Sequence, residues 1–378
     1  MTQLQKQIDF IIGTPLCLII GIFTKLIRSQ QPLQPKKILI IKLWAIGDSI
    51  LMLPLVAALK KIYPNARIDC LCRHQNYKII QTSHLFDNIL IFEPQHMLSL
   101  LRKIRFYEIC FDGEPYLRIS AILAALFSSY RIGFNHDIRN LTYQSTSTHK
   151  LQHMVENYLD MGRELGHHIK SPTELVKLTI PKKDRNTAIH ILKTKGIKPT
   201  DCIITLAPHV GNQGRTRLWN QQNWAMLADT LHNTYTAHIL FLGTDTDTNY
   251  ITQIQHLMKS PSTNLSGCTT LTQTIALLEL STLTVSLDAG IMHMAACQGK
   301  PTIGLFGPNT PQLWKPYGTQ TRAIYHSIEC SPCIQNKTGI IPDCLRTTDR
   351  YLCMKLITTK EIVNAAGELL EPNHHNTS

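Results

Sequence analysis

Short apolar runs alternate with helical patterns along most of the chain. In the helical segments an apolar residue recurs every three or four positions, whereas the runs between them are short and continuous, as in buried strands. Strand-like runs in the first half cover residues 37–42, 67–72, 88–92, 108–111 and 131–134. Alternating strands and helices predict a parallel sheet with helices on both faces.

A second series of the same kind begins after residue 200. It includes strands over residues 202–206, 238–242, 283–287 and 301–306. A chain of 378 residues is long for a single α/β domain, so two domains are expected. The sequence predicts an α/β fold of two Rossmann-like, doubly wound domains, residues 36–180 and 181–357, which face a central cleft. A closing helix and tail follow over residues 358–378.

The first 35 residues form a separate apolar segment. Its uncharged stretch FIIGTPLCLIIGIFT would extend about 22 Å as a helix, less than the roughly 30 Å of a bilayer's hydrocarbon core. On a helix its small residues form one stripe and leave Ile, Leu and Phe on the remaining surface: Gly13, Cys17, Gly21 and Thr24. We expect this helix to rest on an anionic membrane surface. The alternative is a helix that packs on the protein's own core.

The net charge of +12 and the pI of about 9.2 favour anionic partners. Basic residues neither form a block nor alternate with aromatic residues, so we expect no nucleic acid among those partners. The eleven cysteines are an odd number and mostly lie apart, which argues against a disulfide framework and for a reducing compartment.

The most informative stretch is LTVSLDAGIMHMAACQGKPTIGLFGPN, residues 283–309. A buried strand is followed by Asp288, Ala289 and Gly290, and then by a small-residue helix. Unpaired N–H groups at the start of such a helix bind phosphate in open α/β sheets. Asp288 would cap the helix or accept from a ligand hydroxyl, and His293 would lie near the anion. The alternative is an ordinary strand–helix–strand unit with a capping Asp and a core His.

The first strand leads through the sequence LWAIG to Asp48, where a helix starts. This segment lacks the three spaced glycines of a dinucleotide-binding fingerprint, so a nicotinamide cofactor is not indicated. A carboxylate at the carboxyl end of a central strand can act as general base toward a substrate hydroxyl. The alternative role of Asp48 is the N-cap of the helix that follows.

Polar residues also follow the first two strands of the second domain. The loop HVGNQGRTRLW contains Asn212, Arg215 and Arg217, and a guanidinium there would neutralise phosphate charge unless it is a solvated surface charge. The next strand leads to the segment GTDTD. In that segment Asp247 is expected to contact ribose hydroxyls, with helix capping as its second role and metal binding as its third.

Four cysteines gather near the C-terminus: Cys330, Cys333, Cys344 and Cys353. A CxxC pair with two further thiols fits tetrahedral zinc, although a second CxxC is missing. Buried free thiols and a redox-labile disulfide stay open as alternatives.

Several of these stretches together resemble glycosyltransferase family 9, the lipopolysaccharide heptosyltransferases. The resemblance runs from about Lys36 to about Gly367. It rests, in this order, on ILIIKLWAIGDSILMLPLVAALKKIYP, HMVENYLDMGRELG, a basic residue before Trp219, LDAGIMHMAACQGKPTIGLFGPN and the late cysteines.

The resemblance implies a GT-B fold whose N-terminal domain binds the acceptor and whose C-terminal domain binds a nucleotide-sugar, usually ADP-heptose. Transfer would invert the anomeric centre with no obligatory cofactor, and Asp48 matches the family's base. On the acceptor side we expect Gly47 and His153. Together with the residues placed by spacing, the donor-side set is Asn212, Arg217, Asp247, Asp288, Ala289, Gly290 and His293.

Two positions depart from the family pattern. Ala289 stands where the family usually has Ser or Thr, and Arg217 replaces the more usual Lys, which changes the geometry of the charge. The expected activity is transfer of a heptose or related sugar to a lipopolysaccharide core or related surface glycan. The enzyme would be peripheral, on the cytoplasmic face of the inner membrane. A GT-B-shaped sugar-nucleotide epimerase and a non-catalytic, membrane-docked nucleotide-binding scaffold stay open as alternatives.

Overall fold

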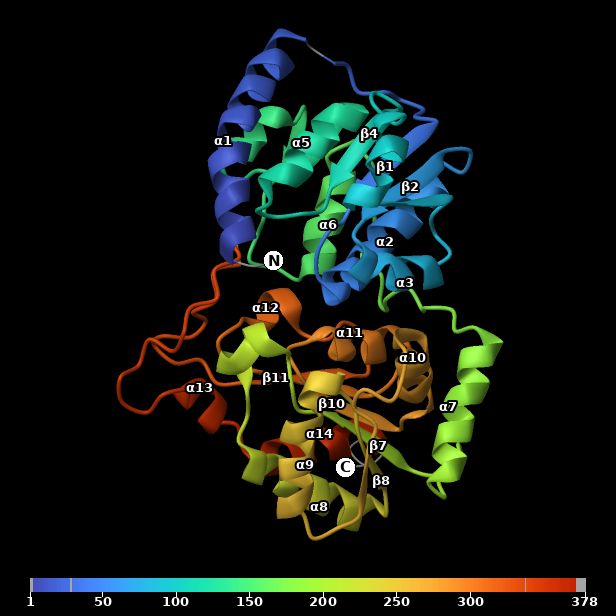
Figure 1. The fold of residues 1–378 in the computed structure, drawn as a ribbon, viewed down its shortest axis with the longest axis vertical. Helices are drawn as coiled ribbons and strands as arrows, with labels where there is room; N and C mark the ends of the chain where they lie inside the picture. The colour runs from blue at the N-terminus through green and yellow to red at the C-terminus, as the bar shows by residue number, and fades with distance from the viewer. Residues whose placement is uncertain (1–2, 28, 337, 372–378) are drawn as a thin grey trace, which may run out of the picture. The chain divides into compact units, whose positions relative to one another are not determined.

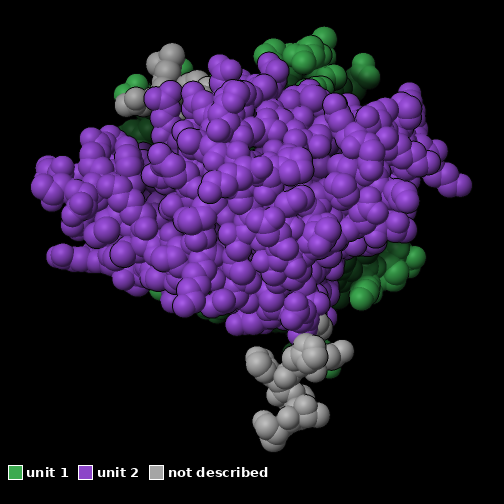
Figure 2. Space-filling model, turned by 90° about the horizontal axis from the view of Figure 1, so that it is seen from below, with its two compact units in different colours: residues 1–172, 336–339 green, residues 173–335, 340–378 purple. Residues whose placement is uncertain are grey.

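The computed structural model describes residues 3–27, 29–336 and 338–371, without the side chains of Asn212 and Gln213. The chain forms two compact units, which Figure 2 colours separately. Unit 1 comprises residues 1–172 and 336–339, and unit 2 comprises residues 173–335 and 340–378. Each unit contains a six-stranded parallel sheet, which confirms the predicted pair of Rossmann-like α/β domains. The boundaries at residues 35, 180 and 357 stay predictions.

The sheet of unit 1 has the strand order β3-β2-β1-β4-β5-β6. Its strands are β1 Lys37–Ile41, β2 Arg67–Cys72, β3 Asn88–Ile91, β4 Tyr107–Asp112, β5 Ser128–Phe134 and β6 Ser145–Ser147. After the N-terminal helix α1 (Gln3–Leu26), its helices are α2 Ile46–Ile62, α3 His74–Thr82, α4 Met97–Leu101, α5 Arg118–Phe127 and α6 Met154–Arg163. The strand order reverses between β1 and β4, and ligands of open α/β sheets bind beyond the carboxyl ends of the strands at such a point.

The sheet of unit 2 repeats this arrangement with the order β12-β11-β10-β7-β8-β9. Its strands are β7 Ile203–Ala207, β8 His238–Phe241, β9 Ser262–Asn264, β10 Leu283–Leu287, β11 Thr302–Phe306 and β12 Thr321–Tyr325. Its helices are α7 Lys182–Thr194, α8 Gln221–Tyr235, α9 Thr248–Leu257, α10 Leu271–Leu280, α11 Gly290–Cys297, α12 Pro311–Trp314, α13 Leu352–Lys355 and α14 Thr359–Leu370. Helices α8, α9 and α14 share one apolar core with the central strands. The order reverses between β7 and β10, so the start of α11 lies at the corresponding point.

The N-terminal helix α1 (Gln3–Leu26) lies along α5 in unit 1 (Figure 1). Its small-residue stripe faces the protein: a Cβ added at Gly13 would lie 2.5 Å from Cβ of Arg118, and one at Gly21 would lie 2.7 Å from Cβ of Leu141. Cys17, between them on the stripe, is fully buried. Only small residues allow α1 to lie this close to unit 1. The small-residue stripe therefore packs on the protein itself, as the alternative prediction stated.

Polar contacts also attach α1 to unit 1. The Asp9 carboxylate accepts hydrogen bonds from the N–H groups of Arg118 and Ile119, at 3.0 and 2.8 Å, and so caps the start of α5. Near the other end of α1, Nη2 of Arg131 donates to Oγ1 of Thr24 at 2.9 Å. The helix is thus part of the unit 1 fold.

The opposite surface of α1 is apolar and exposed. Its large exposed side chains are Ile8, Phe10, Ile11, Ile12, Leu16, Leu18, Ile19, Ile22, Phe23 and Leu26. By length and composition, the 22 residues Gln5–Leu26, with a mean hydropathy of 1.8, could cross a membrane. The helix is longer than the uncharged stretch because the polar residues before Phe10 continue it.

Three strands were not predicted from the sequence. Two of them, β6 and β9, have three residues each, consist of Ser, Thr and Asn, and lie at sheet edges. The third, β12, is a partly exposed edge strand. These three edge strands are polar or partly exposed, so they leave no continuous apolar run in the sequence.

Candidate active site

Asp48 lies just beyond the carboxyl end of β1, in the first turn of α2. The helix begins at Ile46 with Ala45 as its N-cap, so the alternative N-cap role for Asp48 is wrong. The Asp48 side chain is 21% exposed, and its Oδ2 lies 3.4 Å from Nζ of Lys42. The carboxylate is therefore open to solvent while it contacts a buried cation.

The turn that carries Asp48 is strained. Ala45 has a φ of 63° and a ψ of 116°. A positive φ is uncommon for a residue with a Cβ atom and costs about 1–3 kcal/mol, and such residues cluster at functional sites. Gly47 follows within α2, where it is buried. The chain thus accepts strain in the short connection that leads from β1 to Asp48.

A buried carboxylate, Glu114, fixes this turn. Its Oε1 accepts hydrogen bonds from the N–H groups of Leu43 and Trp44, at 2.7 and 2.9 Å, and from Nζ of Lys42 at 3.1 Å. Burial by itself lowers the pKa of Lys42, but the charges of Glu114 and Asp48, with Tyr158 nearby, raise it well above its ordinary value. Lys42 is therefore a fixed positive charge, which favours the ionised form of Asp48.

The predicted acceptor-side residue His153 has a structural role. Its Nδ1 accepts a hydrogen bond from the N–H of Val155 at 3.2 Å, which makes His153 the N-cap of α6. The side chain is largely buried. Direct contact of His153 with an acceptor stays a prediction.

In unit 2, α11 begins shortly after β10, and its N-cap residue makes no side-chain hydrogen bond to the helix. Ala289 is the N-cap residue, and Gly290 and Ile291 are the first residues of the helix. Gly290 and Ile291 are both partly exposed. The first N–H groups of a helix have no partner within it, so this end of α11 presents main-chain donors at the positive end of the helix dipole. His293 is buried in the first turn.

Asp288 is bound by side chains of its own unit and does not cap α11. Its Oδ2 accepts from Nδ2 of Asn309 at 2.7 Å and lies 3.4 Å from Nη1 of Arg217. The same Nη1 donates to the main-chain oxygen of Asp288 at 2.9 Å. The predicted donor-side pair, Arg217 and Asp288, therefore meets directly at the start of α11. Arg215 is exposed, in keeping with a solvated surface charge, and the side chain of Asn212 lies outside the described residues.

Asp247 forms a capping box with Thr244. Its Oδ2 accepts from the N–H and Oγ1 of Thr244, at 2.7 and 2.9 Å, and its Oδ1 lies 2.5 Å from Nδ1 of His209. Both carboxylate oxygens thus have protein partners, which is the second of the roles expected for this residue. Contact of Asp247 with ribose stays a prediction.

The four late cysteines are free thiols that line one small cavity of about 20 Å³. Burial, and to a smaller extent the neighbouring Cys333, raise the pKa of Cys353 to about 11. Within the described residues, no group of three or more His, Cys, Asp or Glu side chains is arranged to hold a metal ion. In this structure the four side chains are free thiols, of which Cys353 is buried and the other three are partly exposed. Zinc binding by the four cysteines stays a prediction.

The sequence reasoning missed Lys42, Glu114 and Asn309. Each lies just past a strand end: Lys42 follows β1, Glu114 follows β4 and Asn309 follows β11. Because β1 pairs with β4 and β10 with β11, these ends are neighbours in the sheets. Their position after a strand end could have marked these three residues as site candidates. Which residues they contact depends on the strand order, which the sequence alone does not give.

Comparison with known proteins places the chain in a family. The model of glycosyltransferase family 9 (heptosyltransferase) matches residues 97–340, more than half of the chain. Lipopolysaccharide heptosyltransferase 3 of Escherichia coli is 22% identical over 292 residues, which cover 72% of this chain and 83% of that protein.

Solved structures agree in fold. A glycosyltransferase family 9 protein from Veillonella parvula superimposes with a TM-score of 0.74 at 20% identity, over 90% of this chain and 99% of that one. E. coli ADP-heptose lps heptosyltransferase II gives a TM-score of 0.69 at 20% identity, over 88% and 98%. The fold is of the GT-B type, and neither the epimerase nor the non-catalytic scaffold is favoured. The chain is therefore a glycosyltransferase and belongs to glycosyltransferase family 9, the heptosyltransferases.

Proposed function

We propose that this enzyme transfers heptose from ADP-heptose to a lipopolysaccharide core or a related lipid-linked glycan. The proposal is supported by family membership and by relatives whose names state lipopolysaccharide and ADP-heptose. The observation that carries it is Asp48, an accessible carboxylate on a strained strand-end turn beside a buried Lys42.

Asp48 acts as the general base in this scheme. It takes the proton from an acceptor hydroxyl as the hydroxyl oxygen attacks the anomeric carbon of the donor. The bond from that carbon to the diphosphate breaks, ADP leaves with the bonding electrons, and the configuration at the carbon inverts. Lys42 favours the ionised carboxylate, which is the form that accepts a proton.

Unit 2 binds the donor. The uncapped start of α11 offers main-chain N–H groups to the diphosphate, whose negative charge increases as the bond breaks. Arg217 contributes positive charge at the same place, and its contacts with Asp288 fix its position. Main-chain donors do not depend on a side-chain hydroxyl, so Ala289 leaves this part of the site intact.

The enzyme is a peripheral protein of the cytoplasmic face of the inner membrane in this proposal. Support comes from the exposed apolar surface of α1 and from the net charge of +12, which favours anionic lipid. The docked small-residue stripe keeps α1 on unit 1, so the exposed surface rests on the lipid while the stripe stays on the protein.

Release of ADP from ADP-heptose in the presence of a lipid A–Kdo acceptor tests the activity. Asp48→Asn should lower kcat by about 10²- to 10⁴-fold, the usual range for a general base. Asp160→Asn in α6 is the matched control and should retain near-normal turnover. Unchanged turnover in Asp48→Asn would remove the base assignment. ADP release only from another nucleotide-sugar would replace the donor, and product from the donor alone would indicate an epimerase.

A further inference from the structure

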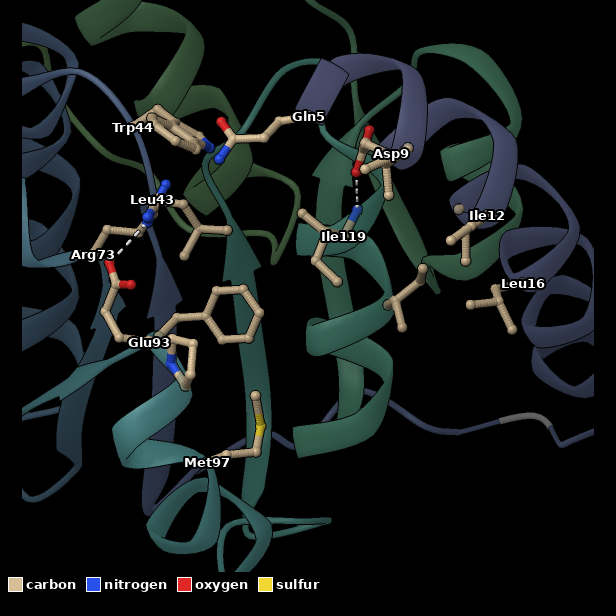
Figure 3. A pocket seen from close by; sticks show the side chains of 15 residues that line it. Gln5, Asp9, Ile12, Leu16, Leu43, Trp44, Arg73, Glu93, Met97 and Ile119 are labelled. Atoms are coloured by element: carbon tan, nitrogen blue, oxygen red, sulfur yellow. Dashed lines mark hydrogen bonds and ion pairs between the residues drawn. The ribbon is translucent and has the colours of Figure 1, made fainter. Parts of the chain in front are cut away.

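Unit 1 contains a mainly apolar pocket of about 400 Å³ between α1 and the carboxyl ends of the strands (Figure 3). Its apolar lining comes from α1, from α5 and from segments that follow β1 and β3: Ile8, Ile12, Leu16, Leu43, Trp44, Phe92, Met97, Ile119 and Ile122. Pockets for small ligands typically measure about 300–1,000 Å³. The space is thus large enough for a ligand and is built by unit 1 alone.

The charged groups on the pocket wall are already paired. Nε of Arg73 lies 3.0 Å from Oε1 of Glu93, and the guanidinium stacks 4.4 Å from the ring centre of Trp44. Asp9 is engaged by the start of α5. Figure 3 shows the joined Arg73 and Glu93 beside Trp44, with Met97, Ile12 and Leu16 elsewhere around the pocket. Because Arg73 and Glu93 neutralise each other and main-chain N–H groups bind the Asp9 carboxylate, the lining favours an apolar ligand over a nucleotide or a free anion.

Large apolar side chains stay exposed around this pocket. Ile12 is 57% and Met97 42% exposed, and the outer surface of α1 carries further large exposed apolar side chains. Contiguous exposed apolar surface marks an interaction site. An apolar chain from a bilayer under α1 would reach the pocket along apolar side chains.

Part of the pocket wall lies in the short connection from β1 to α2, and the candidate base lies in the first turn of α2. Leu43 and Trp44 line the pocket, and Asp48 follows four residues after Trp44. The N–H groups of Leu43 and Trp44 donate to Glu114, which also binds Lys42, the partner of Asp48. A ligand in the pocket would therefore contact the same fixed turn that positions the candidate base.

We propose that the pocket binds one acyl chain of the lipid-linked acceptor and so brings an acceptor hydroxyl to Asp48. This inference rests on the proposed transfer to a lipid-linked glycan and adds that the enzyme recognises the acceptor's lipid as well as its sugar. Three features favour an acyl chain as the ligand. The lining is apolar, its charged side chains already have partners, and the exposed apolar surface of α1 lies beside the pocket.

Steady-state kinetics with two acceptors test the inference, one acylated and one chemically deacylated, both assayed with the same vesicles. Met97→Trp fills the pocket, whereas Leu98→Trp places the same side chain on the next residue, which is 81% exposed and does not line the pocket. Met97→Trp should raise KM for the acylated acceptor about tenfold, the effect of losing roughly two buried methylenes. It should leave kcat/KM for the deacylated acceptor unchanged, and Leu98→Trp should change neither.

A binding measurement separates this inference from the proposed function. An environment-sensitive fluorescent fatty acid should bind wild type and Leu98→Trp alike, and Met97→Trp about tenfold more weakly. The acylated acceptor should displace the probe and the deacylated acceptor should not, even if neither is turned over. Equal effects of the two Trp variants, or a probe that the acylated acceptor fails to displace, would overturn the inference. If the acylated acceptor displaced the probe but was not turned over, the acyl-chain pocket would be supported and the proposed reaction would be contradicted.

Discussion

Two buried charges set the environment of Asp48. Lys42 and Glu114 are each about 2% exposed, and each would be costly to bury alone. As a pair they balance each other's charge, and Glu114 also accepts hydrogen bonds from two main-chain N–H groups of the turn. The turn is thus fixed by a network in which every member depends on the others.

Glu114→Gln should show this dependence. The amide retains an acceptor oxygen but removes the charge that balances Lys42, so the free energy of unfolding should fall by about 3 kcal/mol. A turn that is less well fixed misplaces Asp48, and kcat should fall about 10- to 100-fold. Urea denaturation and ADP release measure the two effects.

Glu368→Gln is the control for this change. Glu368 pairs with Arg322 at 3.1 Å, but both side chains are largely exposed, so this change should cost less than about 1 kcal/mol. Equal losses in the two variants would show that burial does not strengthen the Glu114 network.

Asp160 in α6 gives a stability effect that depends on pH. Burial alone raises the pKa of Asp160, but hydrogen bonds from Lys150, Arg163 and Gln152 hold it below its usual 3.8. A lowered carboxyl pKa adds stability that is present above the unfolded pKa and is lost as the pH falls through the folded pKa. Asp160→Asn should therefore destabilise by less than about 1 kcal/mol at neutral pH, and its difference from wild type should vanish on acidification below the folded pKa. Thermal unfolding across pH measures it, and a difference that grows in acid would contradict the assignment.

The strands differ in how accurately the sequence predicted them. Central strands such as β1 and β10 are continuous apolar runs, because a parallel strand is buried on both faces, and these were predicted almost to the residue. The polar edge strands β6 and β9 carry no such pattern, since their place is fixed by the neighbour they pair with. Apolar periodicity therefore predicts the centre of each sheet and the apolar edge strand β3, and misses the other three edge strands.

The site follows the same rule. The positions of Asp48 and Asp288 were predictable because each follows a recognisable buried strand. The orientation of Asp288 was not, because its partner Asn309 belongs to the segment after a different strand, 21 residues along the chain. The strand-end pattern predicted that Asp247 contacts ribose hydroxyls, with helix capping as its second role. Only the structure shows that Thr244 and His209 contact both oxygens of its carboxylate.

Helix α1 packs on unit 1 and also leaves exposed the apolar surface that the proposed membrane contact needs. The stripe of Gly13, Cys17 and Gly21 allows close packing against unit 1, and the large apolar residues point elsewhere. Removing the whole segment would also remove the Asp9 cap of α5 and expose the surface under the stripe. A deletion of residues 1–31 would therefore confuse membrane release with loss of folding, and substitutions on the exposed surface are the sharper test.

The two units share one topology but differ in what they contribute. Unit 1 contains the candidate base, the apolar pocket and the exposed helix, so the proposed acceptor and membrane functions lie in one unit. Unit 2 contains the uncapped α11 and the Arg217 contacts with Asp288. Membrane attachment should therefore be separable from donor chemistry.

The double change Ile19→Glu and Phe23→Glu tests this separation. Both side chains are more than half exposed on α1, and neither lines the pocket. Each loses an apolar contact with lipid worth about 1.5 kcal/mol or more, so binding to anionic vesicles should weaken roughly 100-fold. Flotation with vesicles measures binding, and ADP release with a deacylated acceptor should stay within about twofold of wild type, because that acceptor does not need the membrane.

Met226→Glu with Leu257→Glu is the matched control. These residues are 50% and 46% exposed on α8 and α9 of unit 2, so the pair makes the same change in charge and apolar content away from α1. Flotation of this control should match that of wild type. If both double variants lost vesicle binding equally, the attraction would come from net charge alone, and the exposed surface of α1 would not be the membrane contact.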